Sequence, residues 1–178
     1  KQLVIQGGKK LFGTINISGS KNASLPILAA TLLIDEKITL KNIPDVKDIS
    51  TMINLLESIG KKINFLDSRN EIVITSKKNK KLIAPYNLVK TMRAGVLVLG
   101  PLLAKYGQAR VSLPGGCAIG SRPVDLHIDM LRKMGAKIKI DKGYIVAKVI
   151  KKLKPSKLKF ETISVGATEN LIMAATLC

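Results

Sequence analysis

The stretch "LLESIGKKINFLDSRNEIVIT" (residues 55–75) determines how the chain is organised, because a related stretch, "MLRKMGAKIKIDKGYIVAKV", follows at residues 130–149. Each copy contains the end of an amphipathic helix, a glycine, a strand, a polar turn and a second strand. Gly60 and Gly135 stand where a helix needs a left-handed residue in order to end. After them, "KKINF" and "AKIKI" alternate between polar and apolar residues, which is typical of half-buried strands. The sequence therefore predicts a structural repeat.

The segments that precede these two copies also match. "ASLPILAATLLI" (23–34) is similar to "MRAGVLVLGPLLA" (92–104), and each predicts an apolar helix followed by a short strand, a loop and an amphipathic helix. The repeating unit is therefore helix, strand, helix, strand, strand, with a period of about 70–75 residues. A third copy begins at "GATENLIMAATLC" (166–178) and stops within its first helix. Because a repeat unit cannot bury its apolar helix alone, we expect this chain to be the N-terminal part of a longer protein.

Composition places the chain among globular proteins. Apolar residues make up 46% of its 178 residues, which is enough for a hydrophobic core. The longest apolar run, "AGVLVLGPLLA" (94–104), is too short to span a bilayer, and the N-terminal residues lack the apolar region of a secretory signal. Two cysteines do not make a disulfide framework. The sequence thus predicts a cytoplasmic protein with free thiols and no membrane partner.

The net charge of +18 raises the question of a nucleic-acid partner. However, 25 of the 30 basic residues are lysines spread along the whole chain, and only five are arginines. Aromatic residues are 3% of the chain, which leaves few platforms for stacking bases. A lysine-rich solvated surface is therefore the favoured interpretation, with no nucleic-acid partner, and anionic small molecules remain compatible with the charge.

Two segments could bind anions. In "SGSKNASLP" (18–26), a Ser/Gly turn leads into a helix that begins near Lys21 and Asn22, so the positive end of the helix and the ammonium favour an anion. The alternative is an ordinary helix cap with a surface lysine. Arg93 lies among small apolar residues of a predicted helix. It is either a surface arginine or a cation that points from the core into a cleft.

The segment "LPGGCAIGSRPVD" (113–125) carries the most distinctive chemistry. Its two glycines let the backbone approach a ligand, and Cys117 follows them directly. A free cysteine is most often buried and inert, but a loop position with Arg122 and Arg110 nearby in sequence favours a reactive thiolate. Both interpretations stay open from the residues alone. His127 has no cysteine or histidine at metal-ligand spacing and is expected to be structural or solvent-facing.

Three stretches identify a resemblance: "SGSKNASLPILAATLL", "YNLVKTMRAGVLVLGPLLAKYGQARVSLPGGCAIGSRPVDLHI" and "SVGATENLIMAATL". Together they resemble the UDP-N-acetylglucosamine 1-carboxyvinyltransferase family, and the similarity runs from about residue 3 to the last residue. The resemblance implies transfer of enolpyruvyl from phosphoenolpyruvate to the 3'-hydroxyl of UDP-N-acetylglucosamine, with release of phosphate, through a tetrahedral ketal. This is the first committed step of peptidoglycan synthesis, and the family is the target of fosfomycin.

The resemblance also implies a fold. The family forms an inside-out α/β barrel, in which two domains of repeated units have helices inside and close on the substrates. We therefore expect residues 1–20 to form strands that belong partly to the other domain, and residues 21–178 to form a repeat-built domain with an incomplete third unit. The family's aspartate base lies in that other domain, so the 178 residues alone are not expected to turn over.

The resemblance further implies roles for particular residues. Cys117 matches the proton donor, which also forms a covalent adduct with phosphoenolpyruvate. Lys21 and Asn22 match the pair that binds phosphoenolpyruvate, and Arg93 and Arg122 match arginines that contact anionic groups. At Thr162 some relatives carry lysine. The segments that match the family's binding site for the uridine diphosphate comprise Arg122, Pro123, Val124, Asp125 and Leu126, together with Thr162, Ile163, Ser164, Val165 and Gly166.

The family uses no cofactor and no metal. Two alternatives to the main prediction remain: another enolpyruvyl transferase, of the shikimate-pathway type, and a basic nucleic-acid-binding or purely structural repeat protein. The sequence gives no oligomeric state.

Overall fold

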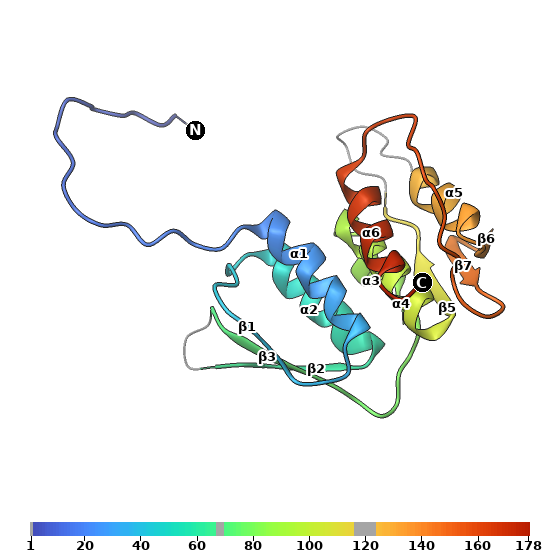
Figure 1. The fold of residues 1–178 in the computed structure, drawn as a ribbon. Helices are drawn as coiled ribbons and strands as arrows, with labels where there is room; N and C mark the ends of the chain where they lie inside the picture. Colours follow the sequence, from blue (N-terminus) through green and yellow to red (C-terminus); the bar gives the residue numbers. More distant parts are fainter. Residues whose placement is uncertain (1, 67–69, 116–123) are drawn as a thin grey trace.

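The computed structural model describes residues 2–66, 70–115 and 124–178, which form two successive α/β units and the first helix of a third (Figure 1). The first unit consists of helix α1 (Lys21–Ala30), the 3₁₀ helix η1 (Thr31–Leu33), strand β1 (Ile38–Leu40), helix α2 (Lys47–Ile59) and strands β2 (Lys61–Phe65) and β3 (Ile72–Ser76). β3 lies between β1 and β2 and is antiparallel to both.

The second unit repeats this arrangement with additions at its start. It consists of strand β4 (Ile83–Ala84), helix α3 (Tyr86–Val89), the 3₁₀ helix η2 (Arg93–Val98), helix α4 (Leu99–Tyr106), strand β5 (Gln108–Ser112), helix α5 (Asp125–Lys133) and strands β6 (Lys137–Asp141) and β7 (Tyr144–Lys148). β7 lies between β5 and β6 and is antiparallel to both, while β4 adds to β5 in parallel. Helix α6 (Val165–Ala175) begins the third unit. The strand order β5-β7-β6 repeats β1-β3-β2, which confirms the predicted repeat.

The helix ends follow from the sequence pattern. On α2 the buried apolar residues recur three and four positions apart, so that one face packs against the core. Gly60 ends α2 with a φ of 132°, and its amide donates to the carbonyl of Leu56 at 3.0 Å. Gly135 follows α5 with a φ of 94°. Both glycines therefore have the positive φ that the sequence predicts, which side chains rarely tolerate.

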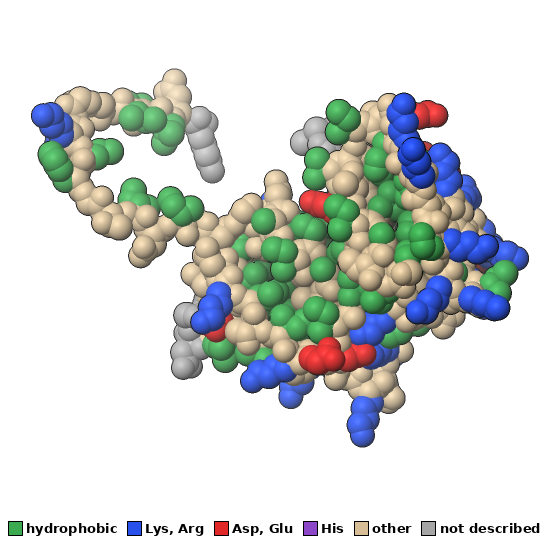
Figure 2. Space-filling view, in the orientation of Figure 1, with side chains coloured by type: hydrophobic (Ala, Val, Ile, Leu, Met, Phe, Trp, Pro, Cys, Tyr) green, Lys and Arg blue, Asp and Glu red, His purple; other side chains and the backbone are tan. Residues whose placement is uncertain are grey.

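The helices gather in the centre of the molecule and the two open sheets lie outside them (Figure 1). Fully buried leucines from both units, among them Leu28, Leu56, Leu99 and Leu131, belong to one continuous core. Figure 2 shows hydrophobic side chains over the face formed by α1 and α6, with lysines and arginines around its edges. Within the described ranges, no helix combines the length and the apolar character needed to cross a membrane.

Residues 2–20 form an extended arm that leads away from the body (Figure 1). Strands were predicted for residues 1–20, but none is formed along residues 2–20, and Leu3, Leu11, Phe12 and Ile15 are each more than 80% exposed. A strand needs a neighbouring strand to pair its backbone groups, and none of the described strands pairs with the arm. Its assignment to a second domain stays a prediction.

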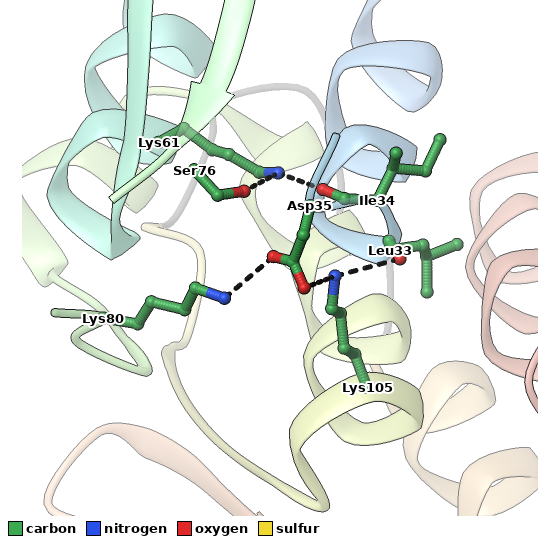
Figure 3. Close-up of polar contacts among 7 residues, drawn as sticks. All are labelled: Leu33, Ile34, Asp35, Lys61, Ser76, Lys80 and Lys105. Carbon is green, nitrogen blue, oxygen red and sulfur yellow. Dashed lines mark hydrogen bonds and ion pairs between the residues drawn. The ribbon is translucent and has the colours of Figure 1, made fainter. Parts of the chain in front are cut away.

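A polar cluster joins the two units at the end of η1 (Figure 3). Asp35 accepts hydrogen bonds from Lys80 at 2.8 Å and from Lys105 of α4 at 2.7 Å. These bonds hold the pKa of the Asp35 carboxyl well below its usual range and raise the pKa of Lys80. Lys61 is buried, and its ammonium donates to the Ile34 carbonyl at 2.6 Å and to Ser76 Oγ at 2.9 Å. Lysines from both units thus hold the chain segment that follows η1.

Candidate functional site

Helices α1, α2, α5 and α6 all begin on the same side of the molecule, the upper side in Figure 1. The first turn of a helix leaves backbone N–H groups without an intrahelical acceptor and carries the positive end of the helix dipole. Four such ends on one side favour the binding of anionic groups there.

Lys21 and Asn22 are the first two residues of α1, where the sequence analysis expected them. Ser20 caps the helix, since its Oγ accepts from the amide of Ala23 at 3.4 Å. The Lys21 ammonium lies 2.9 Å from Oδ2 of Asp48, which is in the first turn of α2. Asp48 is not among the site residues predicted from the sequence, although an acidic residue at the start of an amphipathic helix is a typical signal.

Gly19 fixes the turn before α1 against the loop of the first unit. A Cβ on Gly19 would clash with the carbonyl oxygen of Asn42 and would lie 3.2 Å from Cδ of Pro44. Only glycine therefore fits at this position without movement of the backbone. The contact brings the start of α1 close to the loop that leads into α2.

Arg93 begins η2 and is half-buried. The chain that leads toward Cys117 passes close by, because a Cβ on Gly115 would lie 2.9 Å from the carbonyl oxygen of Lys90 and 3.1 Å from its Cβ. Cys117, Arg122 and Pro123 themselves lie outside the described residues. On either side of these residues, the structure describes Gly115 and Val124. Gly115 lies close to Lys90, which precedes Arg93, and Val124 directly precedes α5.

The two segments expected to bind the uridine diphosphate lie at the starts of α5 and α6. Asp125 is exposed in the first turn of α5, and Leu126 beside it is half-buried. Ser164 caps α6 by accepting from the amide of Ala167 at 3.3 Å. Thr162, Ile163 and Val165 are exposed, and Gly166 is partly buried.

A buried polar network, which the sequence analysis missed, joins these helices. Asn170 of α6 is fully buried, and its side chain contacts the amide of Gly100, the carbonyl of Val96 and the ring of His127. His127 of α5 is 7% exposed, and burial lowers its pKa to about 4. In the sequence, the one feature that could have indicated this network is Asn170 itself, a single asparagine on the apolar face of the helix predicted at 166–178, because a buried amide needs hydrogen-bond partners.

The described site has the chemistry of an anion-binding surface. Lys21, Arg93 and the four helix starts supply positive charge and N–H donors, while Asp48 and Asp125 place carboxylates in the first turns of α2 and α5. Arg110, by contrast, stacks on the ring of Tyr144 at 4.5 Å. In the part of the chain that the structure describes, no group of three histidine, cysteine, aspartate or glutamate side chains could hold a metal ion.

The fold defines the class of protein. The enolpyruvyl transferase NikO from Streptomyces tendae superposes with a TM-score of 0.67 over 84% of this chain and 32% of its own, at 19% identity. An EPSP synthase from Acinetobacter baumannii gives a TM-score of 0.71 over 93% of this chain and 38% of its own, at 17% identity. The chain therefore has the enolpyruvyl transferase fold, as predicted.

The sequence comparisons identify the family. The model of the EPSP synthase (3-phosphoshikimate 1-carboxyvinyltransferase) family matches residues 5–178, and the chain belongs to this family. It is also 60% identical over 177 residues to the UDP-N-acetylglucosamine 1-carboxyvinyltransferase of Pelagibacter ubique, and 53% identical over 176 residues to that of Acinetobacter guillouiae. Each alignment covers 99% of this chain and 42% of the relative, so the chain spans less than half the length of these curated relatives.

Proposed function

We propose that the full-length protein transfers the enolpyruvyl group of phosphoenolpyruvate to the 3'-hydroxyl of UDP-N-acetylglucosamine, the first committed step of peptidoglycan synthesis. The observation that carries this proposal is the identity of 53–60% with relatives named for that reaction, over nearly the whole chain. Similarity to the EPSP synthase structure is much lower, at 17% identity, so the shikimate-type reaction is the less supported alternative. Peptidoglycan precursors of this kind are made in the cytoplasm, where we place the protein.

The chemistry requires a base, a proton donor and several cations. The sugar hydroxyl gives its proton to the base and its oxygen forms a bond to C2 of phosphoenolpyruvate while C3 gains a proton from the donor; the resulting ketal then loses phosphate and a proton from C3. Cys117 is the proposed donor of the first proton, because a thiol has a pKa that its surroundings can tune. Lys21, Asn22, Arg93 and Arg122 would hold the anionic groups, since both substrates carry several negative charges that must come close together.

The remaining proposed contacts belong to the sugar nucleotide. The starts of α5 and α6 lie on the side where α1 places Lys21, so a sugar nucleotide bound at the starts of α5 and α6 would lie on the same side of the molecule as Lys21. Residues 122–126 and 162–166 are the proposed binding segments. No cofactor or metal enters the proposed reaction.

The test is phosphate release by the full-length protein with UDP-N-acetylglucosamine and phosphoenolpyruvate. Cys117→Ala should lower kcat by about 10²–10⁴, the usual contribution of a general acid. Cys117→Asp should retain more activity, because a carboxyl can also donate a proton. Cys178→Ala is the matched control, since Cys178 is the other cysteine of these 178 residues and follows the end of α6, away from the proposed binding segment at the start of that helix, and it should behave as the wild type.

Two results would contradict the proposal. Full phosphate release by Cys117→Ala would exclude Cys117 as the acid. Phosphate release with 3-phosphoshikimate as acceptor, and none with UDP-N-acetylglucosamine, would assign the alternative reaction.

A further inference from the structure

The buried network around Asn170 satisfies each polar atom of its amide. Oδ1 accepts from the amide of Gly100 at 2.7 Å, and Nδ2 donates to the carbonyl of Val96 at 3.4 Å and lies 3.0 Å from Nδ1 of His127. Asn170 is completely buried among apolar residues of α6. A buried amide without partners would be costly, so these contacts restrict how α6, α5 and the η2–α4 segment can sit against one another.

The same contacts determine which ring nitrogen of His127 carries the proton. The Gly100 amide can only donate, so the atom of Asn170 that faces it must be the carbonyl oxygen, and the NH₂ group must face His127. Nδ1 of His127 is therefore the acceptor, and a neutral ring carries its proton on Nε2. Protonation of Nδ1 would set two donors against each other, in agreement with the lowered pKa of this ring.

Two of the three elements that the network joins, α5 and α6, carry the proposed binding segments for the sugar nucleotide, and the third, η2, begins with Arg93, a proposed contact for anionic groups. Of the first segment, residues 122–126, the structure describes Val124, which precedes α5, and the first α5 residues Asp125 and Leu126. Of the second segment, residues 162–166, Ser164 caps α6, and Val165 and Gly166 are its first residues. Gly166 is also close to the ring, since a Cβ there would lie 3.9 Å from Cε1 of His127. Helix α1, with Lys21, makes no hydrogen bond to the network in the described contacts.

We infer that His127 and Asn170 are positioning residues that hold the starts of η2, α5 and α6 in the arrangement that binds the nucleotide diphosphate. This inference rests on the proposed function. It predicts an asymmetric effect, because the hydrogen bonds of the network join both nucleotide segments and none of them reaches α1, which carries Lys21. Loss of the network should weaken binding of UDP-N-acetylglucosamine more than it affects the KM for phosphoenolpyruvate.

The experiment compares variants of the full-length protein by titration calorimetry with UDP-N-acetylglucosamine and by steady-state kinetics with phosphoenolpyruvate. His127→Leu leaves the Asn170 NH₂ group without its partner and should raise the Kd for the sugar nucleotide about tenfold or more. His127→Gln, which keeps a polar group of similar size but moves its acceptor, should act in the same direction and provides a second test if the leucine variant does not fold. His127→Asn places an acceptor near the Nδ1 position and should restore the Kd to within about threefold of wild type.

Asp129→Asn is the matched control, because Asp129 is exposed on the same helix and forms an ion pair with Arg132 at 3.2 Å, away from the network. It should leave the Kd unchanged. An unchanged Kd in folded His127→Leu or His127→Gln, even with a lower melting temperature, would overturn the inference and leave only a structural role. An equal loss of affinity in Asp129→Asn or in His127→Asn would also overturn it. Absence of binding by the wild-type protein would instead refute the proposed function.

Discussion

The close contact between α4 and α6 predicts that Gly100→Ala is strongly destabilising. A Cβ on Gly100 would clash with both the backbone and the side-chain oxygen of Asn170 and would lie 3.3 Å from Cβ of Ala174. Overpacking of this kind costs about 1–3 kcal/mol, and displacing Asn170 would break its bond to the Gly100 amide for about 1–3 kcal/mol more. The higher helix propensity of alanine offsets at most about 1 kcal/mol of this loss of stability. The net loss should be about 3 kcal/mol.

Urea unfolding of the full-length protein, followed by far-UV circular dichroism, measures this loss. Gly166→Ala is the matched control, because Gly166 also lies in a first helical turn and its added Cβ would meet only Cε1 of His127 at 3.9 Å. That variant should be as stable as wild type or more stable by a few tenths of a kcal/mol. A Gly100→Ala protein as stable as the Gly166→Ala protein would refute the packing argument.

Two titrating groups give further predictions. Because burial lowers the pKa of His127 to about 4, the unfolded chain binds this proton first, and the free energy of unfolding should fall by about 3 kcal/mol between pH 6.5 and 4. His127→Asn should remove that part of the fall in acid unfolding curves, and an unchanged slope would contradict the assignment. Burial lowers the pKa of Lys61 to about 8, so stability should rise between pH 8 and 10.5 by about 3 kcal/mol. Lys61→Met should lack this rise, whereas exposed Lys62→Met should keep it.

The local part of the fold could be predicted from the sequence. Helix periodicity, strand alternation and the glycines at 60 and 135 depend on neighbouring residues, so they locate the repeat and the ends of α2 and α5. The starts of α1 and α6 were predicted for the same reason, and with α1 the place of Lys21.

Long-range polar contacts could not be predicted in this way. Asn170 and Gly100 are 70 positions apart, and Lys61 and Ile34 are 27 apart, so no local pattern shows that they meet. The lysines at 77–81 were interpreted as a solvated loop, yet Lys80 binds Asp35 of the first unit. The arm is a different case. The family resemblance implies strands there, but a strand requires a partner strand, which the described strands do not supply.

The duplicated strand order has a consequence for how such a protein can change. The loops at 41–46 and 113–124 leave equivalent strands, β1 and β5, and enter equivalent helices, α2 and α5. The first loop helps to close the interior, since Ile43 is 5% exposed and its amide donates to the carbonyl of Asn70 at 2.8 Å. Its counterpart carries the glycines, the cysteine and the arginine in its sequence. Because the unit is duplicated, the loop of the first copy can cover the hydrophobic core while the equivalent loop of the second copy acquires reactive side chains. Residues needed for stability and residues needed for chemistry can therefore occupy different positions.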